Sequence, residues 1–314
     1  RARRPAAAFR APLCCSGAGM NATTLPPGAE LSPARIASGS GSNFLSGFVC
    51  LAPERREGMT AIYAFCRVAD DAVDDAPDQA TGERHLGFWR DELAAAAKGA
   101  ANTPVGRAVQ TTMQRFGVPA APLADLLDGV ATDLAPRPFV DDGELHTYCY
   151  RVAAAVGLAC LPVLGATSAG ARTFADALGH ALQRTNILRD LAADARGGRC
   201  YLPKRWLDEA GVQAEWLAGN GPAAAYAPGG PLDVLCTRLA KAARAEFARA
   251  GAALRSLPRA ERRALVPARI MGAVYEALLT RLERRGGDLR GPRVRVGKAT
   301  KLWRVVQVLL GVRA

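Results

Sequence analysis

Residues 65–75 read FCRVADDAVDD, and four of the last six positions are aspartate. Asp70 and Asp74 are four residues apart, so they share one face of the helix that this region predicts. Two carboxylates ~5 Å apart repel by about 3 kcal/mol at an effective dielectric constant of ~20. A cation would relieve this repulsion, and carboxylates without a nearby His or Cys favour Mg²⁺ or Mn²⁺ over zinc. The stretch indicates either a metal site, with Arg67 placed to meet a phosphate, or a solvated acidic helix end.

A second aspartate motif lies more than a hundred residues further along the chain. Residues 183–203 read QRTNILRDLAADARGGRCYLP, and Arg199 follows the GG pair that ends the predicted helix. The spacing i, i+3, i+7 and i+11 gives one polar helical stripe within about 80°, formed by Gln183, Asn186, Asp190 and Asp194. If the two helices face each other, their carboxylates form two walls of a cavity with basic residues at its rim. Such a cavity suits a metal-bridged diphosphate, which makes the solvated acidic surface the weaker interpretation.

A third stretch, residues 148–157, reads YCYRVAAAVG. Its small side chains predict a helix that approaches its neighbours closely, with Tyr148 at the polar end. Taken alone, this pattern indicates packing rather than chemistry. Residues 152–171 carry no charge and nominally pass the length test for a membrane span. Because Pro162 interrupts them and Ala and Gly are frequent, we expect a core helix followed by a turn.

The fold class follows from the spacing of apolar residues. The chain has 314 residues, 49% of them hydrophobic, and apolar residues recur at helical spacing in most windows. The sequence therefore predicts an all-α protein, a single bundle of many helices without internal repeats. A helix is expected from about residue 54 to residue 75, with Pro53 at its start. Further helices are expected at 83–98, 102–116, 121–133, 141–160, 170–195, 231–255, 259–284 and 298–311.

The net charge of +12 is concentrated at the two ends of the chain. Residues 1–19 hold four arginines and no acid, and residues 284–314 hold nine basic residues and Asp288 as the one acid. A neutral body with basic ends argues against a nucleic-acid-binding face and favours a membrane surface or an anionic ligand. The eight cysteines are scattered without a CxxC motif, which predicts free thiols in a cytosolic protein. We expect a flexible segment over residues 1–35, of uncertain origin before Met20, and one domain over 36–314.

Three stretches together resemble the signatures of the squalene/phytoene synthase family: AIYAFCRVADDAVDD, YCYRVAAAVG and NILRDLAADARGGRCYLP. The resemblance covers roughly residues 36–305. It implies the isoprenoid synthase fold, with helices around a central cavity, and head-to-head prenyl transfer. Within the family, residues 40–67 and 272–303 look most similar to the bacterial presqualene diphosphate synthases of the hopanoid route.

The resemblance also implies roles for individual residues. Asp70 and Asp74 match the first metal-binding pair of the family, and Asp190 and Asp194 match the second. Tyr148 matches a tyrosine implicated in diphosphate departure and proton handling. Residues that match substrate-binding positions, the last three less closely, are Gln183, Asn186, Arg67, Arg189, Arg199, Phe44, Tyr275 and Arg293. The sequence departs from the family pattern at Ala193, where glutamate is usual, at Arg184, where an apolar residue is usual, and at Asn43, where serine is common.

The implied reaction joins two molecules of farnesyl diphosphate into presqualene diphosphate, with Mg²⁺ or Mn²⁺ and without NADPH. Phytoene or dehydrosqualene synthesis is the alternative within the family. A non-catalytic helical assembly protein of the same fold is the alternative from another class, and a nucleic-acid binder is disfavoured.

The C-terminal stretch KATKLWRVVQVLLGV predicts an amphipathic helix over residues 298–311. One face carries Leu302, Val305, Val306, Leu309 and Leu310. Basic residues surround its start and Trp303 suits a lipid interface, so we expect peripheral membrane contact. The alternative is a helix that caps the bundle and buries this stripe. We expect a cytoplasmic protein, peripheral at the inner membrane face, that could meet the enzymes of the next steps.

Overall fold

The computed structural model describes residues 25–39 and 50–311, and all regular secondary structure in these two ranges is helical. A single isolated β-bridge joins Phe139 and Pro203. The α-helices are α1 (Pro33–Gly39), α2 (Pro53–Asp74), α3 (Gln79–Ala97), α4 (Pro104–Phe116), α5 (Ala121–Ala131), α6 (Asp142–Cys149), α7 (Ala155–Leu164), α8 (Ala169–Arg196), α9 (Lys204–Ala210), α10 (Ala214–Leu217), α11 (Pro231–Ser256), α12 (Arg259–Ala264), α13 (Val266–Arg285) and α14 (Lys298–Leu309).

Local sequence signals explain where the principal helices begin. Pro53 and Pro104 occupy first-turn positions, where proline lacks only an N–H that would have no helical partner. Thr103 and Ser168 accept hydrogen bonds from backbone N–H groups at the starts of α4 and α8. The expected all-α class is confirmed, and the six cysteines in the described ranges are free thiols.

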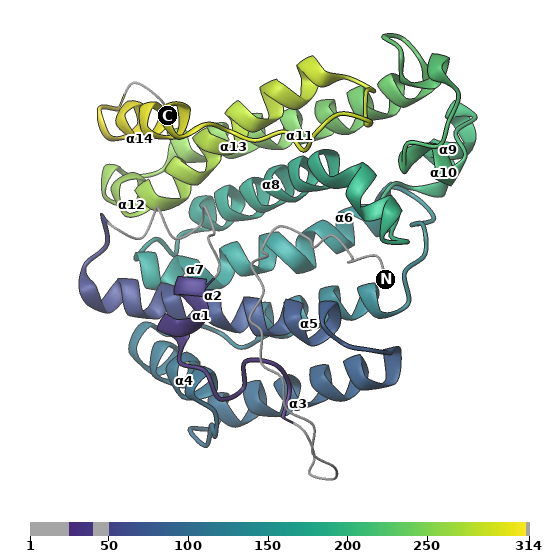
Figure 1. The fold of residues 1–314 in the computed structure, drawn as a ribbon. Helices are drawn as coiled ribbons and strands as arrows, with labels where there is room; N and C mark the ends of the chain where they lie inside the picture. The colour runs from purple at the N-terminus through teal and green to yellow at the C-terminus, as the bar shows by residue number, and fades with distance from the viewer. Residues whose placement is uncertain (1–24, 40–49, 312–314) are drawn as a thin grey trace.

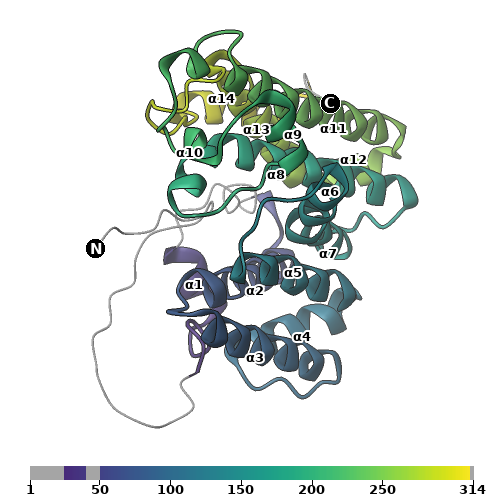
Figure 2. The same cartoon turned by 90° about the vertical axis from the view of Figure 1, so that its right-hand side faces the viewer.

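Helix α8 runs through the middle of the molecule (Figure 1). Helices α11 and α13 pack on one side of it, and α7 packs on the other. The view in Figure 2 shows α1 to α5 gathered in one half of the molecule and α8 to α14 in the other. This arrangement leaves α2 and α8 on opposite sides of a cavity, and they carry the two aspartate motifs.

The backbones of α8 and the α6–α7 segment approach each other closely. A Cβ atom placed on Gly179 would lie 2.4 Å from Ala154 Cα and 2.6 Å from Ala154 N. Residues Tyr150–Ala154 at this contact form one π-helical turn between α6 and α7. The expected close approach of a small-residue helix is therefore present, and glycine is required where the two backbones meet.

The continuous run Asp142–Leu164 is long and apolar enough to cross a membrane by length and composition. Half of its apolar window is buried inside the protein. Several of its remaining side chains, among them Val152 and Val156, line the cavity between α2 and α8. The apolar side chains of this run thus pack in the core on one face and line the cavity on the other.

Some boundaries differ from the sequence expectation. The helix expected over 259–284 is two helices, α12 and α13, because Pro267 cannot continue the hydrogen-bond ladder of the preceding turn. The expected helix 141–160 extends to Leu164 through the π-helical turn. Sequence reasoning did not identify the short helices α1, α9 and α10. The segment expected to be flexible over 1–35 overlaps the described part, where Ala29 is buried and α1 begins at Pro33.

Candidate functional site

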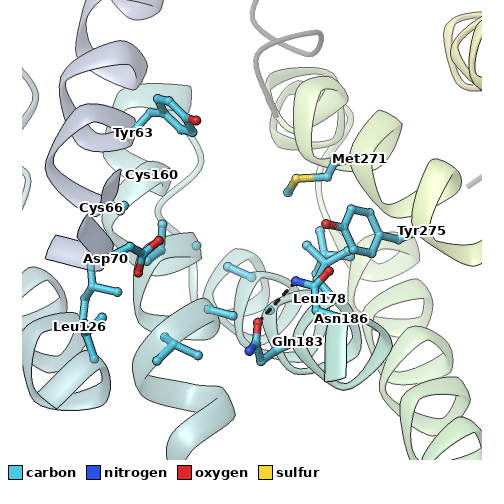
Figure 3. Close-up of a pocket in the computed structure, with 18 of the residues that line it drawn as sticks. Tyr63, Cys66, Asp70, Leu126, Cys160, Leu178, Gln183, Asn186, Met271 and Tyr275 are labelled. Carbon is cyan, nitrogen blue, oxygen red and sulfur yellow. Dashed lines mark hydrogen bonds between the residues drawn. The ribbon is translucent and has the colours of Figure 1, made fainter. Parts of the chain in front are cut away.

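The cavity has a polar end and an apolar end, and the order of residues along each helix defines them. Along α2 its lining runs from Met59 and Tyr63 to Asp70 and Asp74, and along α8 it runs from Phe174 and Leu178 to the second aspartate pair. Because both helices pass from apolar to acidic residues in the same direction, their acidic turns meet at one end. Figure 3 shows Asp70 on the α2 side of the cavity, across from Gln183, Asn186 and Tyr275.

The first aspartate motif divides its carboxylates between the cavity and an arginine. Asp70 and Asp74 line the cavity. Asp71 instead forms an ion pair with Arg67, whose Nη2 lies 2.7 Å from Asp71 Oδ1. Burial raises the pKa of Asp70 well above its usual value, and the neighbouring Asp74 raises it further. A cation bound here would stabilise the ionised carboxylates and lower the pKa of Asp70.

Cys66 corrects one sequence expectation about this face of α2. It lies one turn before Asp70 and also lines the cavity, so the acidic face does include a cysteine. Burial raises the pKa of the Cys66 thiol well above its usual value. The thiol therefore stays protonated and is a poor metal ligand, because metals bind the thiolate. The preference for oxygen ligands is unchanged.

The second aspartate motif is buried, with exposed fractions of 4% for Asp190 and 7% for Asp194. Arg189 Nη2 lies 2.6 Å from Asp190 Oδ2, and Arg293 donates from Nε and Nη2 to the same carboxylate at 2.6 and 2.8 Å. Burial alone would raise the pKa of Asp190, but the hydrogen bonds from Arg189 and Arg293 lower it. Burial and the Asp190 charge raise the pKa of Asp194 to about 7. The pKa values of the two carboxylates are thus shifted in opposite directions.

The two motifs face each other across the cavity, which is the arrangement that a shared site requires. Arg199 follows the end of α8, and its Nη2 donates to Asp74 Oδ1 on α2 at 2.8 Å. Arg199, Asp74 and Asp194 all line the cavity. Acidic walls with arginines between them can hold a diphosphate together with the cations that accompany it.

Two amide side chains lie above the second aspartate pair. Asn186 Nδ2 donates to Gln183 Oε1 at 3.3 Å, and both side chains line the cavity (Figure 3). Asn186 Oδ1 is buried and accepts no hydrogen bond from any described residue. A buried acceptor without a partner is costly, so this oxygen is suited to a ligand donor or to a cation.

Asp133 is a cavity residue that sequence reasoning missed. It lies in the short 3₁₀ turn Thr132–Leu134 after α5, where it accepts a hydrogen bond from Tyr201 at 2.9 Å and from Tyr148 at 3.2 Å. The two tyrosine rings stack with centroids 5.0 Å apart. Burial raises the pKa of Asp133 to about 6, and burial and the Asp133 charge raise the pKa of Tyr148 well above its usual value.

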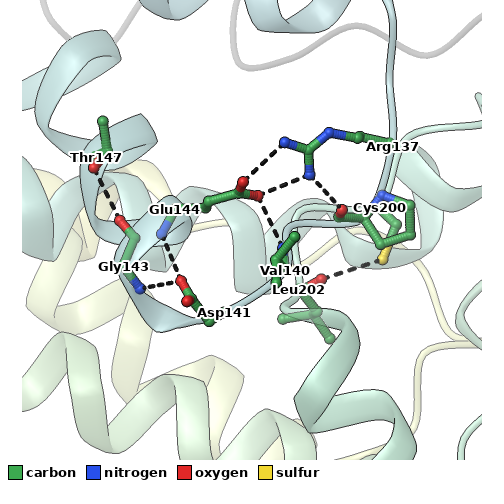
Figure 4. Close-up of polar contacts among 9 residues, drawn as sticks. Arg137, Val140, Asp141, Gly143, Glu144, Thr147, Cys200 and Leu202 are labelled. Carbon is green, nitrogen blue, oxygen red and sulfur yellow. Dashed lines mark hydrogen bonds and ion pairs between the residues drawn. The ribbon is translucent and has the colours of Figure 1, made fainter.

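A polar cluster lies at the start of α6, the helix that carries Tyr148 (Figure 4). Glu144 binds Arg137 through two hydrogen bonds of 2.8 Å and accepts the N–H of Val140 at 2.9 Å. Asp141 caps α6 by accepting the N–H groups of Gly143 and Glu144. The adjoining residue Phe139 packs on the rings of both Tyr148 and Tyr201. The segment after the second motif is thereby fixed against α6.

Comparisons with known proteins agree with this geometry. The family model described as squalene/phytoene synthase matches residues 37–300. The chain belongs to the squalene/phytoene synthase family. A presqualene diphosphate synthase of Zymomonas mobilis subsp. mobilis is 34% identical over 281 residues, which are 88% of this chain and 92% of that relative. A chloroplastic phytoene synthase of Daucus carota is 37% identical over 180 residues, which are 55% of this chain and 45% of that relative.

Solved structures of this squalene/phytoene synthase family share the architecture. A dehydrosqualene synthase crystallised with a ligand superposes with a TM-score of 0.76 at 27% identity, covering 89% of this chain and 94% of that chain. A squalene synthase of Alicyclobacillus acidocaldarius superposes with a TM-score of 0.65 at 28% identity, covering 77% of this chain and 88% of that chain. The expected isoprenoid synthase fold is confirmed.

The departures from the family pattern fall in different places. Arg184 points away from the cavity, with its Nη2 3.4 Å from His146 Nδ1 and its Nη1 3.7 Å from Glu246. It therefore joins α8 to α6 and α11 and does not alter the cavity lining. Ala193 is not among the residues that line the cavity. Phe44 and Asn43 lie outside the described residues.

The residues present fit a divalent cation that prefers oxygen ligands. Within residues 25–39 and 50–311, no three His, Cys, Asp or Glu side chains converge as a complete metal site. Mg²⁺ requires fewer protein ligands, because it keeps several waters and is commonly shared with substrate phosphates. Asp190, Asp194 and the unpartnered Asn186 Oδ1 supply oxygens along one face of α8, opposite the Asp70 pair. Binding of a divalent cation agrees with membership of this family of prenyl diphosphate synthases.

Proposed function

We propose that this enzyme joins two molecules of farnesyl diphosphate head to head, releases diphosphate and forms presqualene diphosphate. The observation that carries the proposal is the ion pair between Arg199 and Asp74, which links the two acidic walls at one end of a cavity whose other end is apolar. A prenyl diphosphate has the same division between a charged head and an apolar tail. The similarity to presqualene diphosphate synthases supports this choice of substrate and product.

The polar end would bind and orient the diphosphates. Asp70, Asp74, Asp190 and Asp194 would hold Mg²⁺, which when bound supplies positive charge that stabilises the departing diphosphate. Arg67 and Arg199 are placed to contact phosphate oxygens. Arg293 is 40% exposed and would transfer its two donors from Asp190 to a phosphate. Tyr275, which lines the cavity, would orient the substrate beside them.

The apolar end would hold the prenyl chains and exclude water from a carbocation. In the proposed reaction the C–O bond of one substrate breaks, the double bond of the second attacks the allylic cation, and loss of a proton closes a cyclopropane. Leu161, Leu178 and Met271 line the end where the chains would lie. Tyr148 keeps its proton because its pKa is raised, and its hydroxyl, which donates to Asp133, would transfer that hydrogen bond to the leaving diphosphate.

The proposal places this reaction in hopanoid synthesis, in the cytoplasm at the inner face of a membrane, without a requirement for NADPH. Phytoene synthesis is the second candidate, and the observation that favours it is the 37% identity to the phytoene synthase of Daucus carota over 180 residues. A non-catalytic assembly role is disfavoured because both aspartate pairs line one cavity.

Product analysis tests the proposal. The purified chain is incubated with farnesyl or geranylgeranyl diphosphate, with and without NADPH, in Mg²⁺ buffer. We expect presqualene diphosphate from farnesyl diphosphate and no conversion to squalene when NADPH is added. Squalene would move the enzyme to the reductive branch of the family. Exclusive use of geranylgeranyl diphosphate would identify a phytoene synthase, and release of no diphosphate with any metal would favour the assembly role.

A further inference from the structure

Helix α14 has one face packed on the bundle and another face open to solvent. Val305 and Val308 pack against Ile270 and Ala273 of α13. The opposite side carries Leu302, Trp303, Leu309 and Leu310, with exposed fractions of 66%, 58%, 58% and 72%. The expectation that this helix caps the bundle is therefore correct for one side only, and four large apolar residues remain uncovered.

This exposed apolar group is concentrated on one element. The other exposed large hydrophobic residues of the described ranges are scattered at Leu25, Val140 and Val234. Single exposed apolar residues are ordinary on protein surfaces, whereas a cluster on one amphipathic helix marks an interaction surface. Trp303 adds an aromatic ring of the kind that is enriched at lipid interfaces.

The surroundings of this group are basic. Helix α14 carries Lys298, Lys301 and Arg304 and no acidic residue. Helix α12 contributes Arg259, Arg262 and Arg263, and its one acid, Glu261, is engaged by Ser168 and by the N–H of Thr167. An apolar face surrounded by positively charged side chains suits an anionic lipid surface, because these side chains can contact lipid phosphates.

Both helices lie at the apolar end of the cavity. Val266, which begins α13 two residues after the end of α12, packs with the α14 contact at Ile270. Figure 1 shows α12 and α14 at the same end of the molecule. The adjoining residues Leu265, Pro267 and Met271 line the apolar end of the cavity. The surface formed by α12 and α14, here called the α12–α14 surface, thus adjoins the apolar end of the cavity, where prenyl chains would lie.

We propose that the α12–α14 surface docks on an anionic phospholipid bilayer. The axis of α14 lies in the plane of the interface, Leu302, Trp303, Leu309 and Leu310 enter the headgroup–acyl boundary, and the basic side chains of α12 and α14 contact lipid phosphates. Docking names a partner for the proposed function, and it turns the apolar end of the cavity toward the bilayer. Binding to lipid does not require turnover, so the two proposals can fail separately.

The test is co-sedimentation of the full chain with vesicles of phosphatidylcholine, with or without phosphatidylglycerol, at low and high salt. The test variant is Leu302→Gln/Trp303→Gln, and the matched control is Val234→Gln on α11, which replaces an exposed apolar residue elsewhere. We expect binding to anionic vesicles that weakens with salt, a loss of at least ~10-fold in the double variant, and no loss in the control. Circular dichroism checks that the variants fold.

Several outcomes would overturn the docking proposal. These are the absence of binding to anionic vesicles at low salt, equal binding by the double variant and the unmodified chain, or equal binding to neutral and anionic vesicles. Analytical ultracentrifugation without lipid tests the other occupant, a second copy of this chain. A dimer that the double variant abolishes, together with no vesicle binding, would assign the surface to self-association. Turnover assayed in detergent should be the same in the double variant, whichever partner binds.

Discussion

Arg199 and Asp74 are 125 residues apart in the chain, yet Arg199 Nη2 lies 2.8 Å from Asp74 Oδ1. This contact ties the segment that follows α8 to the last turn of α2 across the polar end of the cavity. Each side chain lines the cavity itself. The pair therefore ties the two acidic walls together at this end of the cavity, and it presents a guanidinium between them.

Both aspartate pairs should be required for turnover. Replacing Asp70 or Asp190 with asparagine removes a charge and a ligand but keeps the shape of the side chain. We expect each variant to lower kcat by at least ~100-fold, as removal of a key electrostatic contact does. Diphosphate release over a Mg²⁺ titration measures the effect.

The matched control is Asp75→Asn, because Asp75 is the exposed residue that ends α2 and does not line the cavity. This variant should stay within a few-fold of the unmodified enzyme. Near-normal activity of Asp190→Asn would contradict the model in which two walls share one diphosphate.

Asp133 should act by positioning the hydroxyl of Tyr148. Asp133→Asn keeps the size of the side chain but replaces a charged acceptor that two tyrosine hydroxyls share. We expect a loss of ~10-fold or more in kcat with a smaller change in KM, since general acid–base and positioning groups contribute on that scale. Tyr201→Phe leaves Tyr148 as the one tyrosine that donates to the Asp133 carboxylate, and it should lower kcat by less than Asp133→Asn does.

A structural role alone would lower the stability of Asp133→Asn as much as its activity. Thermal unfolding of the variant therefore accompanies the kinetics. Unchanged kcat in Asp133→Asn, or a loss in Tyr201→Phe as large as that in Tyr148→Phe, would contradict this assignment.

The residues of the two acidic walls could be predicted from the sequence, whereas Asp133 could not. Asp190 and Asp194 continue a helical stripe, so their direction follows from the 3.6-residue period. Asp133 lies in a 3₁₀ turn of three residues, which is too short for a periodic pattern. Its partner Tyr201 lies in an extended segment placed by the bridge between Phe139 and Pro203. Only tertiary structure brings these residues together.

The two expectations for α14 illustrate a different limit. The apolar stripe was read correctly as amphipathic, but hydrophobicity alone could not decide which residues the bundle covers. The structure buries Val308, packs Val305 partly buried beside it, and leaves Leu302 and Leu309 exposed. By contrast, Pro267 was a visible signal for the break between α12 and α13, and the expected single helix there overlooked it.

Mg²⁺ affinity should weaken as the pH falls through neutrality. The pKa of Asp194 is raised to about 7 in the protein without metal. Below that pH the carboxyl is mostly protonated, and a cation must displace the proton before it can bind. From about pH 8 to about pH 6 this single group should reduce the apparent affinity by about 10-fold. Asp70, whose pKa is also raised, should add to the effect.

Isothermal titration calorimetry with Mg²⁺ and inorganic diphosphate measures this dependence. Buffers with different ionisation enthalpies report the protons released on binding, which should increase as the pH is lowered below about 7. In Asp194→Asn the part of the pH dependence that comes from this carboxyl should disappear. Affinity that is constant with pH, or tighter at low pH, would show that Asp194 is already ionised in the protein without metal.

The contact between Gly179 and Ala154 should make Gly179→Ala destabilising. The added Cβ would meet backbone atoms of the π-helical turn at 2.4 and 2.6 Å, and backbone cannot move aside as a side chain can. We expect a loss of about 1–3 kcal/mol in the free energy of unfolding, the usual cost of overpacking. Urea denaturation measures the change.

Gly87→Ala on α3 is the matched control, because a Cβ there meets nothing within 4 Å. Alanine costs less backbone entropy than glycine in a helix, so the control should gain up to about 1 kcal/mol. If both variants were stabilised, the close approach of α8 to the α6–α7 segment would not be a constraint on this fold.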